Sequence, residues 1–116
     1  MQIFGTKKCK ATQKAERYLK ERGISYQFID LTQKAMSPRE LDSAAQAVGS
    51  HQDLVDETSK LFQKRGMAWM EYDAREELLE HPELLRTPII RSVPDACVGF
   101  DLDRLEAMVS RAAATK

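Results

Sequence analysis

The chain lacks any apolar stretch long enough to cross a bilayer, and it has no surplus of charge of either sign. Its 18 basic and 18 acidic residues give a formal net charge of +0. A protein that binds nucleic acid through bulk charge needs a basic surplus, so direct nucleic-acid binding of that kind is not expected. Repeats, low-complexity segments and linkers are absent too. We therefore expect a single domain over residues 1–116.

Cysteine is scarce, because Cys9 and Cys97 are the only two in the chain. Three lysines among the first ten residues leave no room for the apolar region of a signal peptide. We therefore expect a cytoplasmic protein whose thiols stay reduced and form no structural disulfide. His51 and His81 lack the spacing of metal ligands, so no metal site is expected.

The chain opens with the pattern of a strand, a helix and a second strand. A short apolar run predicts a strand at residues 2–4, and β-favouring residues predict another at 25–31. Between them, residues 10–22 carry apolar side chains at spacings of three and four, which indicates one face of a helix, and Gly23 suits its C-terminal cap. A crossover of this kind makes the two strands parallel.

A helical block is expected at residues 37–85, as an insertion between the second and third strands. Ser37, Pro38 and Glu40 have the spacing of a capping box at the start of a helix that ends near residue 48. A second helical stretch is expected at residues 53–65, and Asp73 repeats the cap signature for a third. The block is too short to hold a core of its own, so we do not expect it to be an independent domain.

Two strands and a helix close the chain. We expect strands at 88–91 and 96–98, joined as a hairpin, and a last helix capped by Asp101. Residues 113–116 are expected to fray. The fold class is therefore α/β, with a mixed four-stranded sheet. The side chains expected in the core include the stripe Leu102, Leu105, Met108, Val109 and Ala112, as well as Met67, Trp69 and Met70, whereas Glu76, Glu77 and Glu80 are expected to form a solvated helix face.

Cys9 lies where the first strand and its loop lead into the first helix, and it is our candidate catalytic residue. Unpaired N–H groups and the helix dipole favour an anion there, and Lys7, Lys8 and Lys10 add positive charge nearby. Thr12, three residues further on, places its hydroxyl on the same side of the helix as the sulfur. These features predict a pKa for the Cys9 thiol below its usual value of about 8.5, and hence a nucleophilic thiolate. The alternative is that Cys9 only packs at a turn.

The sequence leaves two interpretations open for Cys97 and two for Pro88. Cys97 lies in a predicted strand without a positive neighbour, so it is either a buried core residue or a thiol that resolves an oxidised Cys9. Pro88 either begins a strand or forms a cis peptide bond with Thr87. In a thioredoxin-like fold, a cis-proline at this point faces the nucleophile.

Motifs along nearly the whole chain resemble the arsenate reductase (ArsC)/Spx family. They are FGTKKC at residues 4–9, RGI at 22–24, YQFIDL at 26–31, ELLRTPII at 83–90 and VGFD at 98–101. The resemblance implies a thioredoxin-like, glutaredoxin-type fold with a helical insertion. It also implies a nucleophile at Cys9 and a cis-proline at Pro88.

The chain departs from the reductases of this family at the residues that would hold arsenate. Arginines are expected there, but this chain has Asp56, Thr87 and Phe100, and Gly5 replaces a histidine four residues before the cysteine. An oxyanion without those donors loses charge-assisted hydrogen bonds of about 1.5–3 kcal/mol each. Arg86 and Arg91 are the arginines nearby that could compensate for this loss, unless the alternation of the strand turns them elsewhere. The predicted substrate-binding residues are Thr87, Pro88 and Arg86.

The resemblance implies a monothiol oxidoreductase, because Thr12 stands where Spx-type regulators carry the second cysteine of their switch. Cys9 would attack a disulfide, supported by Thr12, Lys8 and Lys10, and glutathione would resolve the mixed disulfide as co-substrate. The partner is therefore glutathione or a protein thiol or disulfide. No bound cofactor and a monomeric state are expected.

Two alternatives stay open. One is a non-catalytic, Spx-like regulator that docks on RNA polymerase through the insertion, near Lys60, Lys64 and Arg65. The other is arsenate reduction itself.

Overall fold

A four-stranded mixed sheet forms the centre of the protein, with the strand order β2-β1-β3-β4. The computed structural model describes the backbone of residues 1–114 and the side chains of residues 1–111. Strand β1 runs parallel to β2, whereas β3 is antiparallel to both β1 and β4. This is the predicted thioredoxin-like α/β fold. The strands are β1 (Gln2–Gly5), β2 (Gln27–Asp30), β3 (Ile89–Ser92) and β4 (Asp95–Val98).

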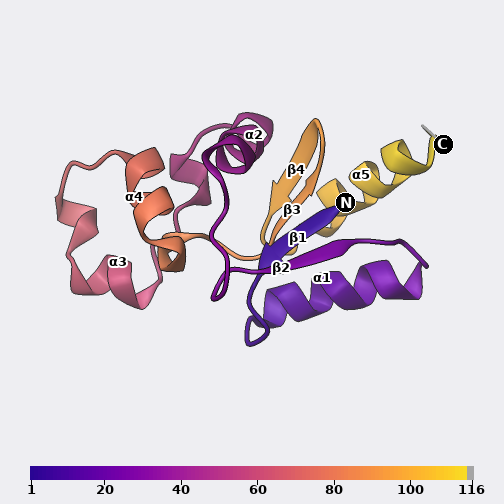
Figure 1. Cartoon of the computed structure of the whole chain (residues 1–116), viewed down its shortest axis with the longest axis horizontal. Coiled ribbons are helices and arrows are strands. Elements are labelled where there is room, and N and C mark those ends of the chain that lie inside the picture. Colours follow the sequence, from indigo (N-terminus) through magenta and orange to yellow (C-terminus); the bar gives the residue numbers. More distant parts are fainter. Residues whose placement is uncertain (115–116) are drawn as a thin grey trace.

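Helices cover both faces of the sheet (Figure 1). Successive strand residues point to opposite faces, so each strand contributes side chains to a core cluster on either side. Ile3 and its partner Ile90 belong to a core cluster with α1 (Lys10–Glu21) and α5 (Leu102–Ala114). The adjacent residues Phe4 and Ile89 belong to the other cluster, with α2 and the helices that follow it. Phe4, Ile3, Ile89 and Ile90 are all fully buried.

The segment between β2 and β3 is built from short helices, and α3 and α4 lie at the end of the molecule away from the sheet (Figure 1). The predicted capping box of α2 is confirmed: Ser37 Oγ accepts from the Glu40 amide over 3.1 Å, and Glu40 Oε1 accepts from the Ser37 amide over 2.9 Å. Asp73 caps α4 in the same manner, by accepting from the Glu76 amide. The elements are α2 (Pro38–Val48), η1 (Gln52–Leu54), α3 (Lys60–Lys64), η2 (Met67–Trp69), α4 (Ala74–Glu80) and η3 (Pro82–Leu84), where η marks a 3₁₀ helix.

The prediction of a helix at residues 53–65 is wrong for its first half. Val55 is extended and pairs with Leu85 in an isolated antiparallel bridge. The Asp56 side chain then accepts from Thr58, and Ser59 caps α3 by accepting from the amide of Phe62. Short polar side chains that bond to nearby backbone compete with helix formation, which explains why the helix begins only at residue 60.

Three side chains expected in the core are exposed. Trp69 is 94% exposed and Met70 is 38% exposed, while Met67 beside them is buried. The short helix η2 at the edge of the fold buries only its first residue. Leu102 is 43% exposed at the start of α5, where Leu105 and Met108 are buried as expected. The side chain of Ala112 and residues 115–116 lie outside the described part of the chain, and the backbone of residues 113–114 belongs to α5.

Polar contacts tie together the helices between β2 and β3. Glu77, expected to be solvated, pairs with Arg65 over 2.5 Å and joins α4 to the end of α3. Asp42 accepts from Arg75 and from His51, each at 2.8 Å. Hydrogen bonds from Arg75 and then His51 lower the pKa of Asp42 to about 2. Arg65, one of the three basic residues named for the regulator alternative, is thus paired with Glu77.

None of the helices in the described part of the chain is both long enough and apolar enough to cross a membrane.

Candidate active site

Cys9 occupies the N-cap position of α1, as its place in the sequence predicts. Its backbone is extended, its amide donates to the carbonyl of Thr6 over 3.2 Å, and its carbonyl accepts the helical hydrogen bond from Gln13 over 3.0 Å. The first amides of a helix have no hydrogen-bond acceptor within the helix. The thiol thus lies half-buried beside donors that favour negative charge.

Thr87, distant in sequence, completes the surroundings of the sulfur. Thr87 Oγ1 donates to Cys9 Sγ over 3.1 Å, and the thiol faces the Thr87 carbonyl oxygen at 3.7 Å. The hydroxyl stabilises the ionised sulfur, whereas the carbonyl accepts from the neutral thiol. The structure therefore brings Thr87, one of the predicted substrate-binding residues, into contact with the sulfur of Cys9.

The pKa of Cys9 is lowered, in the predicted direction but partly for another reason. Burial raises this pKa, and the hydroxyls of Thr12 and Thr87 together with the amides of Thr12 and Ala11 lower it by a larger total. Lys8 and Lys10 are exposed and are not among the groups that shift the pKa. Hydrogen bonding, and not lysine charge, thus favours the thiolate.

Thr12 is fully buried, and its Oγ1 has no regular hydrogen-bond partner among the described residues. Its hydroxyl nevertheless lies near enough to the Cys9 sulfur to lower the pKa of the thiol. A buried hydroxyl without a partner is costly, and the Cys9 thiol is the group whose pKa this hydroxyl lowers. Gly5 makes room for this arrangement, because a Cβ atom there would lie 2.5 Å from Thr12 Oγ1.

Pro88 follows Thr87 through a cis peptide bond, as the family resemblance implied. The side chain of Pro88 is buried, and its carbonyl accepts from the amide of Gly99 over 2.8 Å. The peptide bond between Val93 and Pro94 in the β3–β4 turn is also cis, a feature that the sequence did not predict.

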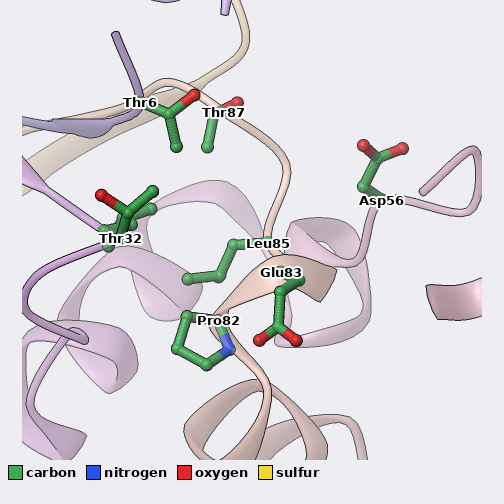
Figure 2. A pocket seen from close by; sticks show the side chains of 8 residues that line it. Thr6, Thr32, Asp56, Pro82, Glu83, Leu85 and Thr87 are labelled. Atoms are coloured by element: carbon green, nitrogen blue, oxygen red, sulfur yellow. The ribbon is translucent and has the colours of Figure 1, made fainter. Parts of the chain in front are cut away.

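A pocket of about 610 Å³ opens beside the site (Figure 2). Thr6 and Thr87, which both contact Cys9, lie next to each other along one side of it. Sequence reasoning did not predict that acidic side chains line this pocket, since the strand pattern gives no sign of which loops meet in space. The lining residues are Thr6, Leu31, Thr32, Asp56, Pro82, Glu83, Leu85 and Thr87.

The remaining arginine candidates are not among the residues that line the pocket. Arg86 is exposed, and its guanidinium donates to the carbonyl of Asp53 over 3.2 Å. Arg91 donates to Ser43 and Gln2 in a partly buried position. Neither residue compensates for the missing arginines of a reductase.

A second pocket adjoins the first, since Thr6, Thr32 and Glu83 line both. Its volume is about 790 Å³, and its other lining residues are Lys7, Lys8, Asp30 and Lys60. Lys8 is therefore placed to meet an anionic group of a bound molecule, whereas Lys10 lines neither pocket.

Cys97 is a core residue, as one of the two interpretations predicted. It is 2% exposed in β4 and packs in the cluster that contains Ile3 and Ile90. Burial, followed by the charge of Asp101, raises its pKa to about 11. A thiol of this kind is a poor nucleophile at neutral pH, which argues against a resolving role.

Within the described residues, no three His, Cys, Asp or Glu side chains gather in a way that could hold a metal ion.

The fold and the site define a thioredoxin-like domain with one accessible, hydrogen-bonded thiol opposite a cis-proline. A sequence profile described as "ArsC family" matches residues 4–108, and the chain belongs to this family.

Individual relatives fall into two groups by name. The chain is 26% identical over 113 residues to global transcriptional regulator Spx 2 of Oceanobacillus iheyensis, covering 94% of this chain and 83% of that protein. The structure of an arsenate reductase from Vibrio cholerae shares the fold, with a TM-score of 0.80, 20% identity and coverage of 93% of this chain and 98% of that one. An arsenate reductase (ArsC) related protein from Brucella melitensis has a TM-score of 0.65 and 26% identity, covering 91% of each chain. The chain is thus similar both to arsenate reductases and to Spx regulators.

Proposed function

We propose that this ArsC-family protein is a monothiol, glutathione-dependent thiol oxidoreductase that uses Cys9 alone. The observation that carries the proposal is the hydrogen bond of 3.1 Å from Thr87 Oγ1 to Cys9 Sγ. Together with the buried hydroxyl of Thr12, it favours the thiolate that attacks disulfides.

The reaction proceeds by two thiol–disulfide exchanges. The Cys9 thiolate attacks the glutathione sulfur of a mixed disulfide, forms a new disulfide with it and releases the other thiol as a thiolate. A second glutathione thiolate then attacks the glutathione sulfur bound to Cys9. Oxidised glutathione leaves, and Cys9 returns to its thiolate form. No second protein thiol is needed, in keeping with the buried position of Cys97.

Three of the predicted site residues, Thr87, Pro88 and Lys8, have a place in this proposal, whereas Arg86 has none. The carbonyl of Thr87, beside the cis-Pro88, is an acceptor for the backbone of a bound peptide. Lys8 in the second pocket suits a carboxylate of glutathione. Arg86 does not line either pocket, so we assign it no part in binding.

Arsenate reduction is less well supported by the chemistry of the site. The pocket beside Cys9 is lined by Asp56 and Glu83 and by no arginine, lysine or histidine. Two carboxylates repel an oxyanion, and no planar cationic donor is present there to offset this repulsion.

The second candidate function is that of a regulator, and one observation favours it. Trp69 is 94% exposed on the part of the chain between β2 and β3, where Lys60 and Lys64 also lie. An exposed tryptophan is common where proteins bind one another. The partner implied by the Spx resemblance is RNA polymerase.

Mass spectrometry after exposure to oxidised glutathione tests the enzymatic proposal. We expect a single glutathione adduct on Cys9, none on Cys97, and none in a Cys9→Ser variant. The adduct should disappear when reduced glutathione is added. A wild-type protein that forms no adduct would contradict the enzymatic proposal and favour the regulator, for which copurification with RNA polymerase, and its loss on Trp69→Ala, is the direct test.

A further inference from the structure

The pocket beside Cys9 has an uneven distribution of charge. Of its eight lining residues, Asp56 and Glu83 are charged at neutral pH, and both are acidic. The lysines of this region, Lys7, Lys8 and Lys60, line the adjoining pocket instead. A molecule that reaches Cys9 past Thr6 and Thr87 therefore places one part of itself next to two carboxylates.

The carboxylate of Asp56 is held in place by its own loop. Its Oδ1 accepts from both the amide and the hydroxyl of Thr58, at 2.9 and 2.6 Å. Its amide donates to the carbonyl of Leu84 over 2.7 Å, next to the bridge between Val55 and Leu85. These contacts involve only Oδ1 and the backbone, so the second oxygen, Oδ2, keeps its capacity to accept a hydrogen bond from a ligand.

Glu83 contributes the second carboxylate from η3, on the chain segment that leads to Thr87. It lies at the boundary of the two pockets, since it lines both. Neither Asp56 nor Glu83 forms an ion pair with a basic residue of the described part of the chain. Both carboxylates thus lack a direct ion-pair partner among the described residues, although Glu83 shares the adjoining pocket with the three lysines.

We propose that this pocket favours disulfides whose reacting arm carries an ammonium group, because the negative charges of Asp56 and Glu83 attract that group while Cys9 attacks the sulfur. The inference rests on the proposed function and specifies the substrate class for the same site. Unpaired carboxylates in a cleft raise the local concentration of cations and lower that of anions. A carboxylate on the same substrate would turn toward the lysines of the adjoining pocket. Glutathione, which carries one ammonium group and two carboxylates, fits this division.

Three small disulfides with different charges test the proposal on the full chain. They are cystamine, which carries two ammonium groups, neutral 2-hydroxyethyl disulfide, and anionic 3,3′-dithiodipropionate. The second-order rate constant for modification of Cys9 is measured for each at low ionic strength. Each variant is compared with wild type on the same disulfide, so that differences in intrinsic reactivity among the disulfides cancel.

The two variants are Asp56→Asn, which keeps an oxygen acceptor for Thr58, and Glu83→Gln on an exposed side chain. Removing one charge from the pocket should slow the reaction with cystamine roughly threefold and the double variant should slow it roughly tenfold. Reaction with the anionic disulfide should accelerate by a similar factor, and the neutral one should change less than twofold. Added salt should shrink these differences. Glu57→Gln, an exposed carboxylate outside both pockets, is the matched control and should change none of the three.

The outcomes separate this inference from the proposed function. If all variants react with the three disulfides as wild type does, the inference is overturned, while the thiol chemistry of Cys9 stands. If wild-type Cys9 does not react even with the neutral disulfide, the proposed function fails and the inference fails with it.

Discussion

Replacing Thr87 with valine removes the hydroxyl that donates to Cys9 Sγ over 3.1 Å and keeps the branched shape of the side chain. A hydrogen bond to a charged group contributes about 1.5–3 kcal/mol, and we take the lower end because the Cys9 sulfur is only half-buried. The variant should therefore have a higher Cys9 pKa and roughly tenfold less thiolate at any pH below the pKa of the wild type.

The loss of thiolate is partly offset by its greater reactivity. The nucleophilicity of a thiolate rises with its pKa, with a Brønsted coefficient of roughly 0.4–0.5, so the remaining thiolate should react about threefold faster. At a pH below both pKa values, Thr87→Val should thus react with 2-hydroxyethyl disulfide about threefold more slowly than wild type. At a pH above both, it should react about threefold faster, and the two pH–rate profiles should cross.

The assay is the rate of Cys9 modification between pH 4 and 10, followed by mass spectrometry after acid quench. Thr32→Val is the matched control, because Thr32 lines the same pocket but its hydroxyl donates to Asp30 and not to the sulfur. The control profile should match the wild type. The reasoning is refuted if Thr87→Val shares the wild-type midpoint, or if it slows the reaction equally at every pH, as a merely disturbed site would.

Three further predictions concern residues around and beyond the sulfur. Gly5→Ala should raise the pKa of Cys9 and lower the melting temperature, because the new Cβ would meet Thr12 Oγ1 at 2.5 Å; in a Thr12→Ala background the same change should have little effect on either measurement. Cys97 should resist iodoacetamide at pH 8 in the folded protein and react only on unfolding, since burial holds its pKa near 11; labelling at the rate of Cys9 would contradict its core position. The pKa of Asp42 lies near 2 in the folded state, below its ordinary 3.8, so its stabilising contribution should be present above pH 4 and be lost as the pH falls through 2. Denaturant unfolding of wild type and Asp42→Asn should therefore converge toward pH 2, and a stability difference that does not change with pH would rule this linkage out.

Local sequence signals predicted the elements and the position of the nucleophile. Ser37 and Glu40 formed the expected capping box, and Cys9 lies at the start of α1. That Cys9 and Thr12 lie on the same side of the helix follows from the helical period alone. These features depend on residues within about one turn of each other, so local sequence is enough to predict them.

The surroundings of Cys9 are different, because they combine segments that lie far apart in the chain. Thr87 is 78 residues away from Cys9, and the hydrogen bond between them exists only because β3 pairs with β1. The sequence placed an arginine beside Thr87, but it could not predict that Arg86 turns to the Asp53 carbonyl and away from the pocket. Which side chain faces the nucleophile is decided by how a loop packs after the strand pairing is set.

Exposure and charge pairing were likewise decided by tertiary structure. Trp69 is a large apolar residue of a type often found in cores. It is exposed because the short 3₁₀ helix η2 lies at the edge of the fold and buries only Met67. Glu77 was expected in water and lies against Arg65 instead. The sequence by itself determined the fold class, the helix caps and a thiol at a helix start. Only packing decided which distant hydroxyl contacts that thiol and which carboxylates line the pocket beside it, since burial and charge pairing depend on neighbours that local periodicity does not specify.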